Sequence, residues 1–157
     1  MLKPTPMLLG LGDRLLPLAS RVPFKLQRLA LEKGLNRIFA GPLKDGAFDM
    51  LEGRWLRLHI RDLGLSWCLT RSRTGLCIAA REQADASISG DWREFLLLAS
   101  RQEDPDTLFF RRRLSIEGDT ELGLAVKNLI DSLDPELLPS WLWRGLEAAG
   151  KGVVAAG

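Results

Sequence analysis

One stretch of this 157-residue chain, residues 104–131, constrains the fold more than any other. Its sequence is DPDTLFFRRRLSIEGDTELGLAVKNLID. Residues 110–116 alternate between two sides, which predicts a strand with one apolar face. Gly118-Asp119 ends this strand, and the Asp119 carboxylate can cap a helix that follows it. That helix has a single apolar stripe, made of Leu122, Val126, Leu129, Ile130 and Leu133.

Four shorter stretches upstream, 55–61, 65–71, 76–80 and 84–89, also alternate between apolar and polar residues. Their close spacing predicts an antiparallel meander. Five strands with one apolar face, and helices to cover that face, predict an α+β fold with a five-stranded, mainly antiparallel sheet. Asp91 is placed to cap one of those helices, with an expected buried stripe of Trp92, Phe95, Leu96 and Ala99.

A basic N-terminal arm, residues 1–44, precedes this domain. It carries eight basic and two acidic residues, a net charge of +6, whereas the remaining residues carry a net charge of −4. The sequence of the arm predicts a helix from Pro23 to about Ala40, which ends at Gly41-Pro42. One face of it holds Phe24, Leu31, Leu35 and Ile38, and Lys25, Lys33 and Arg37 lie mostly on the other side. Two interpretations stay open: a core-packing helix with a solvated basic face, or a helix that lies on an anionic membrane.

The C-terminal tail, residues 134–157, follows the domain proper at 45–133. It holds two of the five tryptophans, Trp141 and Trp143, at helical spacing with Leu142 and Leu146. Small residues and glycines come next, and we expect the helical pattern to end there. The tail either docks onto the domain through a tryptophan, or serves as a lid or an interfacial anchor.

Signals for catalysis are few. The lone histidine, His59, lies between two arginines on the polar side of a predicted strand, and Cys68 and Cys77 lack a CxxC or zinc spacing. The sequence contains no nucleophile elbow, P-loop or dinucleotide-binding glycine motif. Asp104 and Asp106 flank a proline, as turn residues do. We therefore predict a protein without enzymatic activity, metal or cofactor.

The strongest charge cluster is Arg111-Arg112-Arg113. On a strand, Arg112 would lie on the apolar side, which is unusual for arginine. It either pairs with a carboxylate at the edge of the core or meets the phosphate or polar head of a lipid.

Composition suits one soluble domain, with 46% hydrophobic and 27% charged residues. No window approaches the roughly 20 apolar residues of a membrane span, and prolines, glycines and charges interrupt any signal-peptide core near the N-terminus. We expect a cytoplasmic protein, and the two cysteines fit a reducing compartment. Nucleic acid is not the expected partner, because the basic residues of the arm are interleaved with aliphatic and not with aromatic residues.

The segments ADASISGDWREFLLLA (84–99) and 104–131 resemble the sterol-carrier-protein-type lipid-binding domain, and within it the bacterial ubiquinone-biosynthesis accessory factors. The resemblance covers roughly residues 45–133. It implies helices on one face of a five-stranded sheet, with an apolar ligand held between the layers. It also implies a non-catalytic role in ubiquinone synthesis, including an oxygen-independent route with iron–sulfur hydroxylase-type partner proteins.

The expected ligand is therefore an isoprenoid quinone intermediate, with a membrane phospholipid as the alternative, because a prenyl tail exposed to water costs about 0.8 kcal/mol per CH₂. A protein–protein adaptor with a filled core is a second alternative. Peripheral contact with the inner membrane is expected through Lys25, Lys33, Arg37, Trp141 and Trp143. The expected apolar lining of the ligand site is Leu56, Leu58, Ile60, Trp67, Leu69, Phe110, Leu114, Ile116, Leu122, Val126 and Leu129.

Overall fold

The structure, a computed structural model, describes residue 18 and residues 21–156. Its five strands are β1 (Leu56–Ile60), β2 (Leu65–Ser72), β3 (Gly75–Ala79), β4 (Ala86–Gly90) and β5 (Ser115–Gly118). Its α-helices are α2 (Phe24–Ile38), α3 (Ala40–Lys44), α4 (Trp92–Ala99), α5 (Pro105–Phe110), α6 (Thr120–Ser132) and α7 (Ser140–Ala156). Within residues 21–156 the structure also contains the short 3-10 helices η2 (Asp49–Leu51), η3 (Arg61–Leu63) and η4 (Pro135–Leu137).

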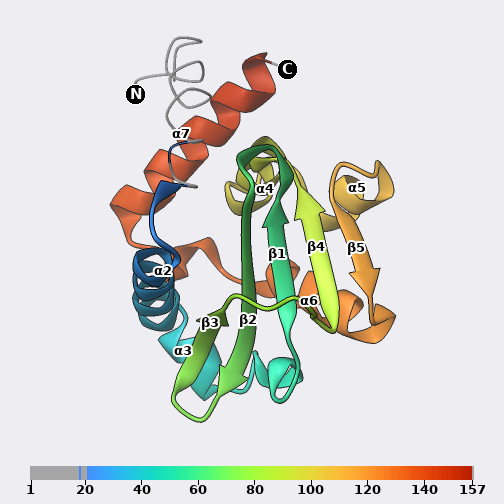
Figure 1. Cartoon of the computed structure of the whole chain (residues 1–157). Helices are drawn as coiled ribbons and strands as arrows, with labels where there is room; N and C mark the ends of the chain where they lie inside the picture. The colour runs from blue at the N-terminus through green and yellow to red at the C-terminus, as the bar shows by residue number, and fades with distance from the viewer. Residues whose placement is uncertain (1–17, 19–20, 157) are drawn as a thin grey trace.

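The predicted five-stranded, mainly antiparallel sheet is confirmed, with strand order β3-β2-β1-β4-β5 (Figure 1). The predicted four-strand meander is wrong at its last strand, because β4 lies beside β1 and runs parallel to it. Residues 80–85 make this crossover. Six extended residues reach about 20 Å, enough to cross the roughly 14 Å of three strand spacings.

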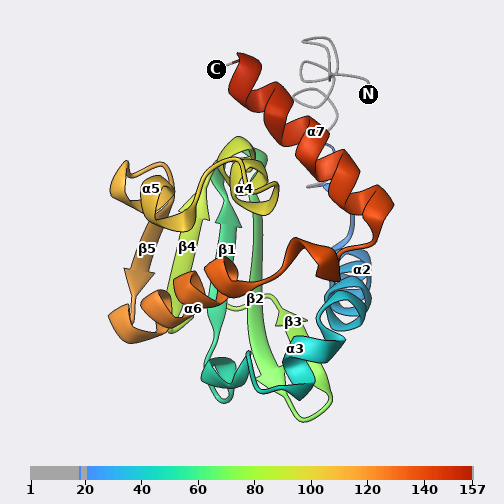
Figure 2. The same ribbon diagram turned by 180° about the vertical axis from the view of Figure 1, so that it is seen from behind.

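One face of the sheet is apolar and carries the helices. Leu58 lies opposite Trp67 on β2 and Ile88 on β4, so one face collects apolar side chains from three strands. Helices α4 and α6 lie on this face (Figure 2). The Asp119 carboxylate accepts a hydrogen bond from the backbone N–H of Leu122 at 3.1 Å, which confirms the predicted cap of α6. The core between the layers includes Leu56, Leu69, Ile88, Leu122, Val126 and Leu129.

The other face of the sheet is crossed by the connection from β3 to β4 (Figure 1). Arg57 donates to the carbonyl of Arg81 at 2.6 Å, and the Asp85 carboxylate accepts from the N–H of Trp55 at 2.7 Å. These bonds hold the crossover against β1 and place β4 at its parallel register.

Helix α2 begins and ends within two residues of its predicted limits, but Gly41-Pro42 lies inside the short helix α3 and not after a helix end. Phe24, Leu31 and Leu35 pack against the core, which is the core-packing interpretation of the arm. The divisions of the chain at residues 44 and 133 stay predictions.

The segment that precedes β5 differs from prediction. Residues 105–110 form helix α5, and the strand begins only at Ser115. The Asp104 carboxylate caps α5 by accepting from the N–H and the hydroxyl of Thr107 at 2.7 and 2.9 Å, and Pro105 occupies the first helical turn. The carboxylate and proline interpreted as a turn are therefore a helix start.

Helix α4 follows its predicted stripe only in part, because Trp92, Phe95 and Leu96 are partly buried against core clusters but are not its most buried residues. Its most buried side chains are Leu97 and Leu98, whereas Ala99 is exposed. The Asp91 side chain makes no cap bond among the described residues, and Asp62 of η3 accepts from the N–H of Trp92 at 3.1 Å instead. The shift of the stripe follows from α7, because Val153 packs on Leu97 from outside.

Helix α7 continues through the small residues where the pattern was expected to end, which corrects that prediction. Gly150 and Gly152 are buried, and Gly150 lies against Ser100 at the end of α4. Small side chains let the two helices approach closely. None of the helices that the structure describes is long and apolar enough to cross a membrane.

Candidate functional site

A cavity of about 410 Å³ lies between the sheet and its helices. This volume falls within the range of about 300–1,000 Å³ that is usual for small-molecule sites. Leu58 and Ile88 form its floor on β1 and β4. The remaining walls come from the helices and from the chain between α6 and α7: Phe39, Phe95, Leu98, Ala99, Arg101, Ile130, Leu133, Asp134, Pro135, Leu137, Leu138 and Leu146.

The wall formed by residues 133–138 depends on local turn chemistry. Asp134 accepts a hydrogen bond from the N–H of Glu136 at 2.9 Å and so begins η4, with Pro135 at the first position. This turn directs Leu137 and Leu138 toward the cavity. The chain then enters α7, which contributes Leu146.

Among the described residues, two charged side chains border the cavity, Arg101 and Asp134. Arg101 follows α4 with a left-handed φ of 59°, a conformation that costs a non-glycine residue about 1 kcal/mol or more. Its guanidinium donates to the carbonyl of Asp131 at 3.4 Å and makes a second, short bond to the carbonyl of Leu133. Arg101 therefore ties the end of α4 to the segment that closes the cavity.

Among the predicted lining residues, Leu58 borders this cavity. Leu56, Leu69, Leu122, Val126 and Leu129 instead fill the core beneath it, and Trp67 packs at the core's edge, where its indole N–H donates to Gln27 at 2.9 Å. Ile60 is half-buried at the end of β1. Leu114 directly precedes β5 and Ile116 belongs to it, and both border a second hollow. Phe110, at the end of α5, is 90% exposed, so its predicted place on an inner face is wrong.

The missed lining residues carried weak sequence signals. Residues 134–138 have no regular period, so the sequence pattern assigns them no face. Ala99 and Leu98 lie on a helix that was identified, but the position of α7 decides which side of that helix is covered. Four lining residues do lie on predicted apolar stripes: Ile130 and Leu133 on that of α6, and Phe95 and Ala99 on that of α4.

The predicted membrane-contact residues are on the surface or near it. Lys25, Lys33 and Arg37 are exposed on α2, Trp141 is 74% exposed, and Trp143 is half-buried. The structure adds an outer apolar stripe on the same side of α2, because Leu26 and Leu29 are 56% and 51% exposed and Val22 precedes them at helical spacing. This stripe was missed, since the pattern on the inner face is stronger.

The residues with reactive side chains lie apart. His59 is half-buried on β1, in register with Ser66 and Ser89, whereas Cys68 is buried. The Cys77 thiol contacts the Ser72 hydroxyl at 3.2 Å. Within the described ranges, no three His, Cys, Asp or Glu side chains are grouped to hold a metal ion.

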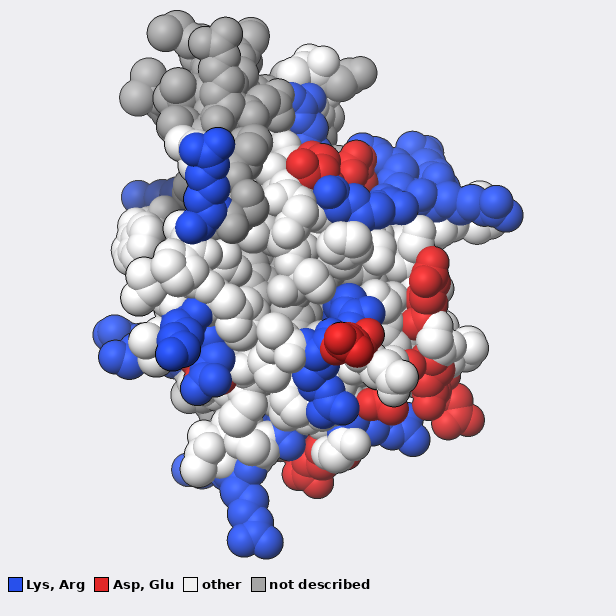
Figure 3. Space-filling view, in the orientation of Figure 1, with Lys and Arg blue, Asp and Glu red and all other residues white. Residues whose placement is uncertain are grey.

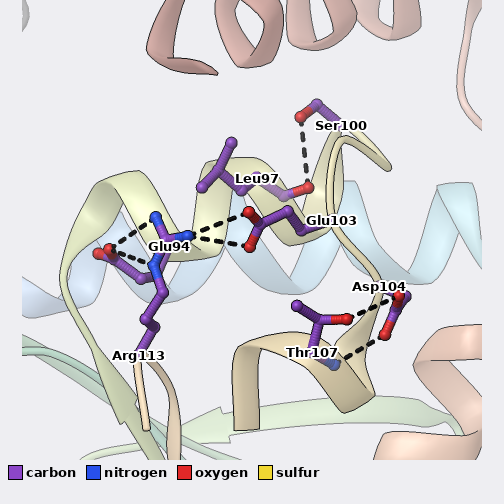
Figure 4. Close-up of polar contacts among 7 residues, drawn as sticks. All are labelled: Glu94, Leu97, Ser100, Glu103, Asp104, Thr107 and Arg113. Carbon is purple, nitrogen blue, oxygen red and sulfur yellow. Dashed lines mark hydrogen bonds and ion pairs between the residues drawn. The ribbon is translucent and has the colours of Figure 1, made fainter. Parts of the chain in front are cut away.

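The arginine cluster lies in the turn between α5 and β5, not on a strand. Arg112 is exposed with φ 58°, so the proposed position on an apolar face is wrong. Arg113 is the residue with carboxylate partners: it bonds to Glu103 at 3.0 Å and to Glu94 at 3.4 Å (Figure 4). Basic side chains gather on the surface in this region, near α5 (Figure 3).

The chain matches known proteins in both sequence and fold. Residues 35–131 match the model of the SCP-2 sterol transfer family. The chain belongs to the SCP-2 sterol transfer family. The matched residues include the whole sheet, α4, α5 and most of α6. They therefore include the floor of the cavity and much of its wall.

A curated relative gives a more specific likeness. The ubiquinone biosynthesis accessory factor UbiT of Escherichia coli (strain K12) is 47% identical over 133 residues, which cover 84% of this chain and 76% of UbiT. UbiT of Escherichia coli O157:H7 shows the same values. Among solved structures, the UbiJ-SCP2 ubiquinone synthesis protein aligns with a TM-score of 0.57 at 24% identity, covering 70% of this chain and 93% of that one. That likeness supports the SCP-2 fold.

Proposed function

We propose that this chain is a non-catalytic lipid-binding accessory factor of ubiquinone biosynthesis, which binds apolar prenylated intermediates. The observation that carries the proposal is the apolar cavity of about 410 Å³ between sheet and helices. An apolar wall suits a hydrocarbon tail, whose burial releases about 0.8 kcal/mol per CH₂. The 47% identity to UbiT favours a ubiquinone intermediate as the source of that tail.

The proposal assigns no chemistry to the chain itself. General acid–base or nucleophilic catalysis needs a reactive group within hydrogen-bond reach of an activating partner. His59 lies on the sheet face opposite the helices, and Cys68 is buried with its thiol near the carbonyl of Arg81 at 3.9 Å. Neither side chain borders the cavity.

Complementation tests this function. A ubiquinone-deficient strain that lacks UbiT should regain anaerobic ubiquinone when it expresses this chain. The triple variant His59→Asn, Cys68→Ala, Cys77→Ser should complement as well, with alanine chosen at position 68 because a buried hydroxyl without a partner is costly. Loss of complementation by this variant, if it is folded and binds lipid, would mean that the chain has a catalytic or redox role.

The wider setting is part of the same proposal. The chain acts in the cytoplasm on an oxygen-independent route, and hands its ligand to hydroxylases that carry their own iron–sulfur clusters. Purified hydroxylase partners from such a route should bind this chain in pull-down experiments with defined components. A requirement for oxygen during complementation would contradict the oxygen-independent assignment.

Peripheral membrane contact through α2 also belongs to the proposal. Its outer side joins Leu26 and Leu29 to the exposed Lys25, Lys33 and Arg37. Basic residues near an anionic bilayer contribute about 1 kcal/mol each. The variant Leu26→Glu, Leu29→Glu should therefore lose co-sedimentation with vesicles that contain phosphatidylglycerol. Equal sedimentation with neutral vesicles would contradict this contact.

A phospholipid carrier is the second candidate function. The observation that favours it is the same cavity, since an acyl chain also suits apolar walls. Competition between a prenylphenol and a phospholipid for the purified protein separates the two. An adaptor with a filled core would bind neither.

A further inference from the structure

We infer that the cavity encloses only one segment of a long lipid tail, so that the chain presents a membrane-embedded ligand instead of carrying it whole through water. This inference rests on the proposed function. It follows from the volume of the cavity, from the placement of its few polar groups and from the outer surface of α2.

The volume sets the first limit. A water molecule takes about 30 Å³ in the liquid, and a methylene group is of similar size. A cavity of about 410 Å³ therefore holds roughly 14 carbon-sized groups. That corresponds to about three five-carbon isoprene units, or to one acyl chain of ordinary length. A much longer polyprenyl tail must leave the cavity.

The polar groups decide which part of the ligand is enclosed. Asp134 is exposed, and its carboxylate accepts from the N–H of Glu136. Arg101 already donates to two backbone carbonyls of the closing segment. The walls deeper in, formed by Leu58, Ile88 and Phe95, offer no partner for a polar head group. A buried polar group without a partner is costly, so the enclosed part is hydrocarbon.

The remaining tail needs an apolar surrounding, and an anionic bilayer fits the outside of the protein. Leu26 and Leu29 are exposed on α2, together with Lys25 and Lys33. Glu32, the acidic residue of this helix, is turned toward the sheet, where its carboxylate accepts from the N–H of Ile78 at 2.8 Å. A bilayer would thus meet apolar and basic side chains on this side of α2.

A chain-length series tests the inference. Polyprenylphenols with one to five isoprene units are titrated into the full-length protein and followed by calorimetry. The affinity should rise about tenfold or more for each of the first units, as each buries more hydrocarbon. It should then change less than about threefold per unit beyond the third. A rise that continues through the fifth unit would overturn the inference.

Two variants test whether the cavity wall sets the chain length at which the affinity stops rising. Ala99→Trp places a large side chain in the wall, so the plateau should shift to a shorter chain by one unit or more. Ala155→Trp, at the exposed end of α7, should leave it unchanged. If Ala99→Trp does not fold by circular dichroism, Leu138→Trp replaces it.

A vesicle experiment tests the presentation step. An eight-unit polyprenylphenol is placed in phosphatidylglycerol–phosphatidylethanolamine vesicles, the protein is added, and the vesicles are sedimented. Protein and phenol should both sediment with the vesicles. A stoichiometric soluble complex with the eight-unit phenol would contradict partial enclosure. Failure of every chain length to bind would instead refute the proposed function.

Discussion

The Asn36 side chain hydrogen-bonds to both backbone groups of Leu76 on the outer edge of β3. Its carboxamide Nδ2 donates to the Leu76 carbonyl at 2.9 Å, and its Oδ1 accepts from the Leu76 N–H at 2.7 Å. The Glu32 carboxylate accepts a hydrogen bond from the N–H of Ile78, two residues further along the strand. Helix α2 therefore substitutes for a missing neighbouring strand and protects this edge of the sheet from pairing with another chain.

The first prediction concerns this contact. Asn36→Ala leaves two half-buried backbone groups without partners, which should cost about 1–3 kcal/mol of stability. The matched control is Arg37→Ala, the next residue on α2, whose side chain is exposed and whose loss should change stability by less than about 0.5 kcal/mol. Urea unfolding of both variants provides the values. Equal stabilities would show that the Asn36 bonds contribute nothing.

A second prediction compares two glycines of α7. A Cβ built at Gly150 would lie 1.9 Å from the Ser100 hydroxyl oxygen, whereas a Cβ at Gly145 meets nothing within 4 Å. Gly150→Ala should therefore destabilise the protein by about 1–3 kcal/mol. Gly145→Ala should stabilise α7 by up to about 1 kcal/mol.

The cause can be isolated with a double variant. The double variant Ser100→Gly, Gly150→Ala should recover most of the stability that Gly150→Ala loses. The change at Ser100 removes the hydroxyl that the new methyl group would meet. Thermal unfolding measures all four proteins. A Gly150→Ala protein as stable as the Gly145→Ala protein would refute the close packing of α7 on α4.

The third prediction concerns the bond from Arg101 to the closing segment of the cavity. Glycine tolerates the left-handed backbone at this position, so Arg101→Gly removes the guanidinium without adding strain. Amide hydrogens of residues 133–138 should exchange faster, and bound lipid should dissociate faster. Arg112→Gly is the control, since Arg112 has nearly the same φ, 58°, and its side chain is exposed. Identical amide exchange of residues 133–138 in the two variants would show that the Arg101 hydrogen bonds do not hold this segment in place.

The fourth prediction is a pH dependence at the start of α5. Hydrogen bonds from the backbone and side chain of Thr107 lower the pKa of Asp104 below its usual value near 3.8. A lowered folded-state pKa stabilises the protein above the unfolded pKa, and this contribution is lost as the pH falls through the folded value. The Tm difference between wild type and Asp104→Ala should therefore be larger at pH 6 than at pH 3. A Tm difference that does not change with pH would contradict this prediction. The control is Asp45→Ala, which removes an exposed carboxylate.

The sequence predicted those elements whose own residues carry the signal. The alternation in 56–60 and the Asp119 cap identified β1 and the start of α6, because strand period and capping are local properties. It could not assign β4 to a parallel position, since alternation reveals a face but not a neighbour. The helix α5 did carry a local signal, Asp104-Pro105, which was outweighed by the alternation after Phe110.

The candidate site was predictable only in outline. A location between sheet and helices is what the resemblance implies, and Leu58, one of the predicted lining residues, borders the cavity found there. Residues 134–138 have no period, and α7 determines which side of α4 stays uncovered. Leu122 and Val126 were expected to line the ligand site, but these buried residues of α6 pack into the core with side chains of the sheet.

Lipid extraction followed by mass spectrometry tests the central claim, that the cavity holds an apolar lipid, most directly. Protein purified without detergent should carry prenylated or acyl lipid as wild type and as Ala155→Trp, and much less of it as folded Ala99→Trp. The claim would be contradicted if the wild-type protein carried no lipid and also failed to bind added prenylphenol. It would also be contradicted if Ala99→Trp and Ala155→Trp carried equal amounts of lipid.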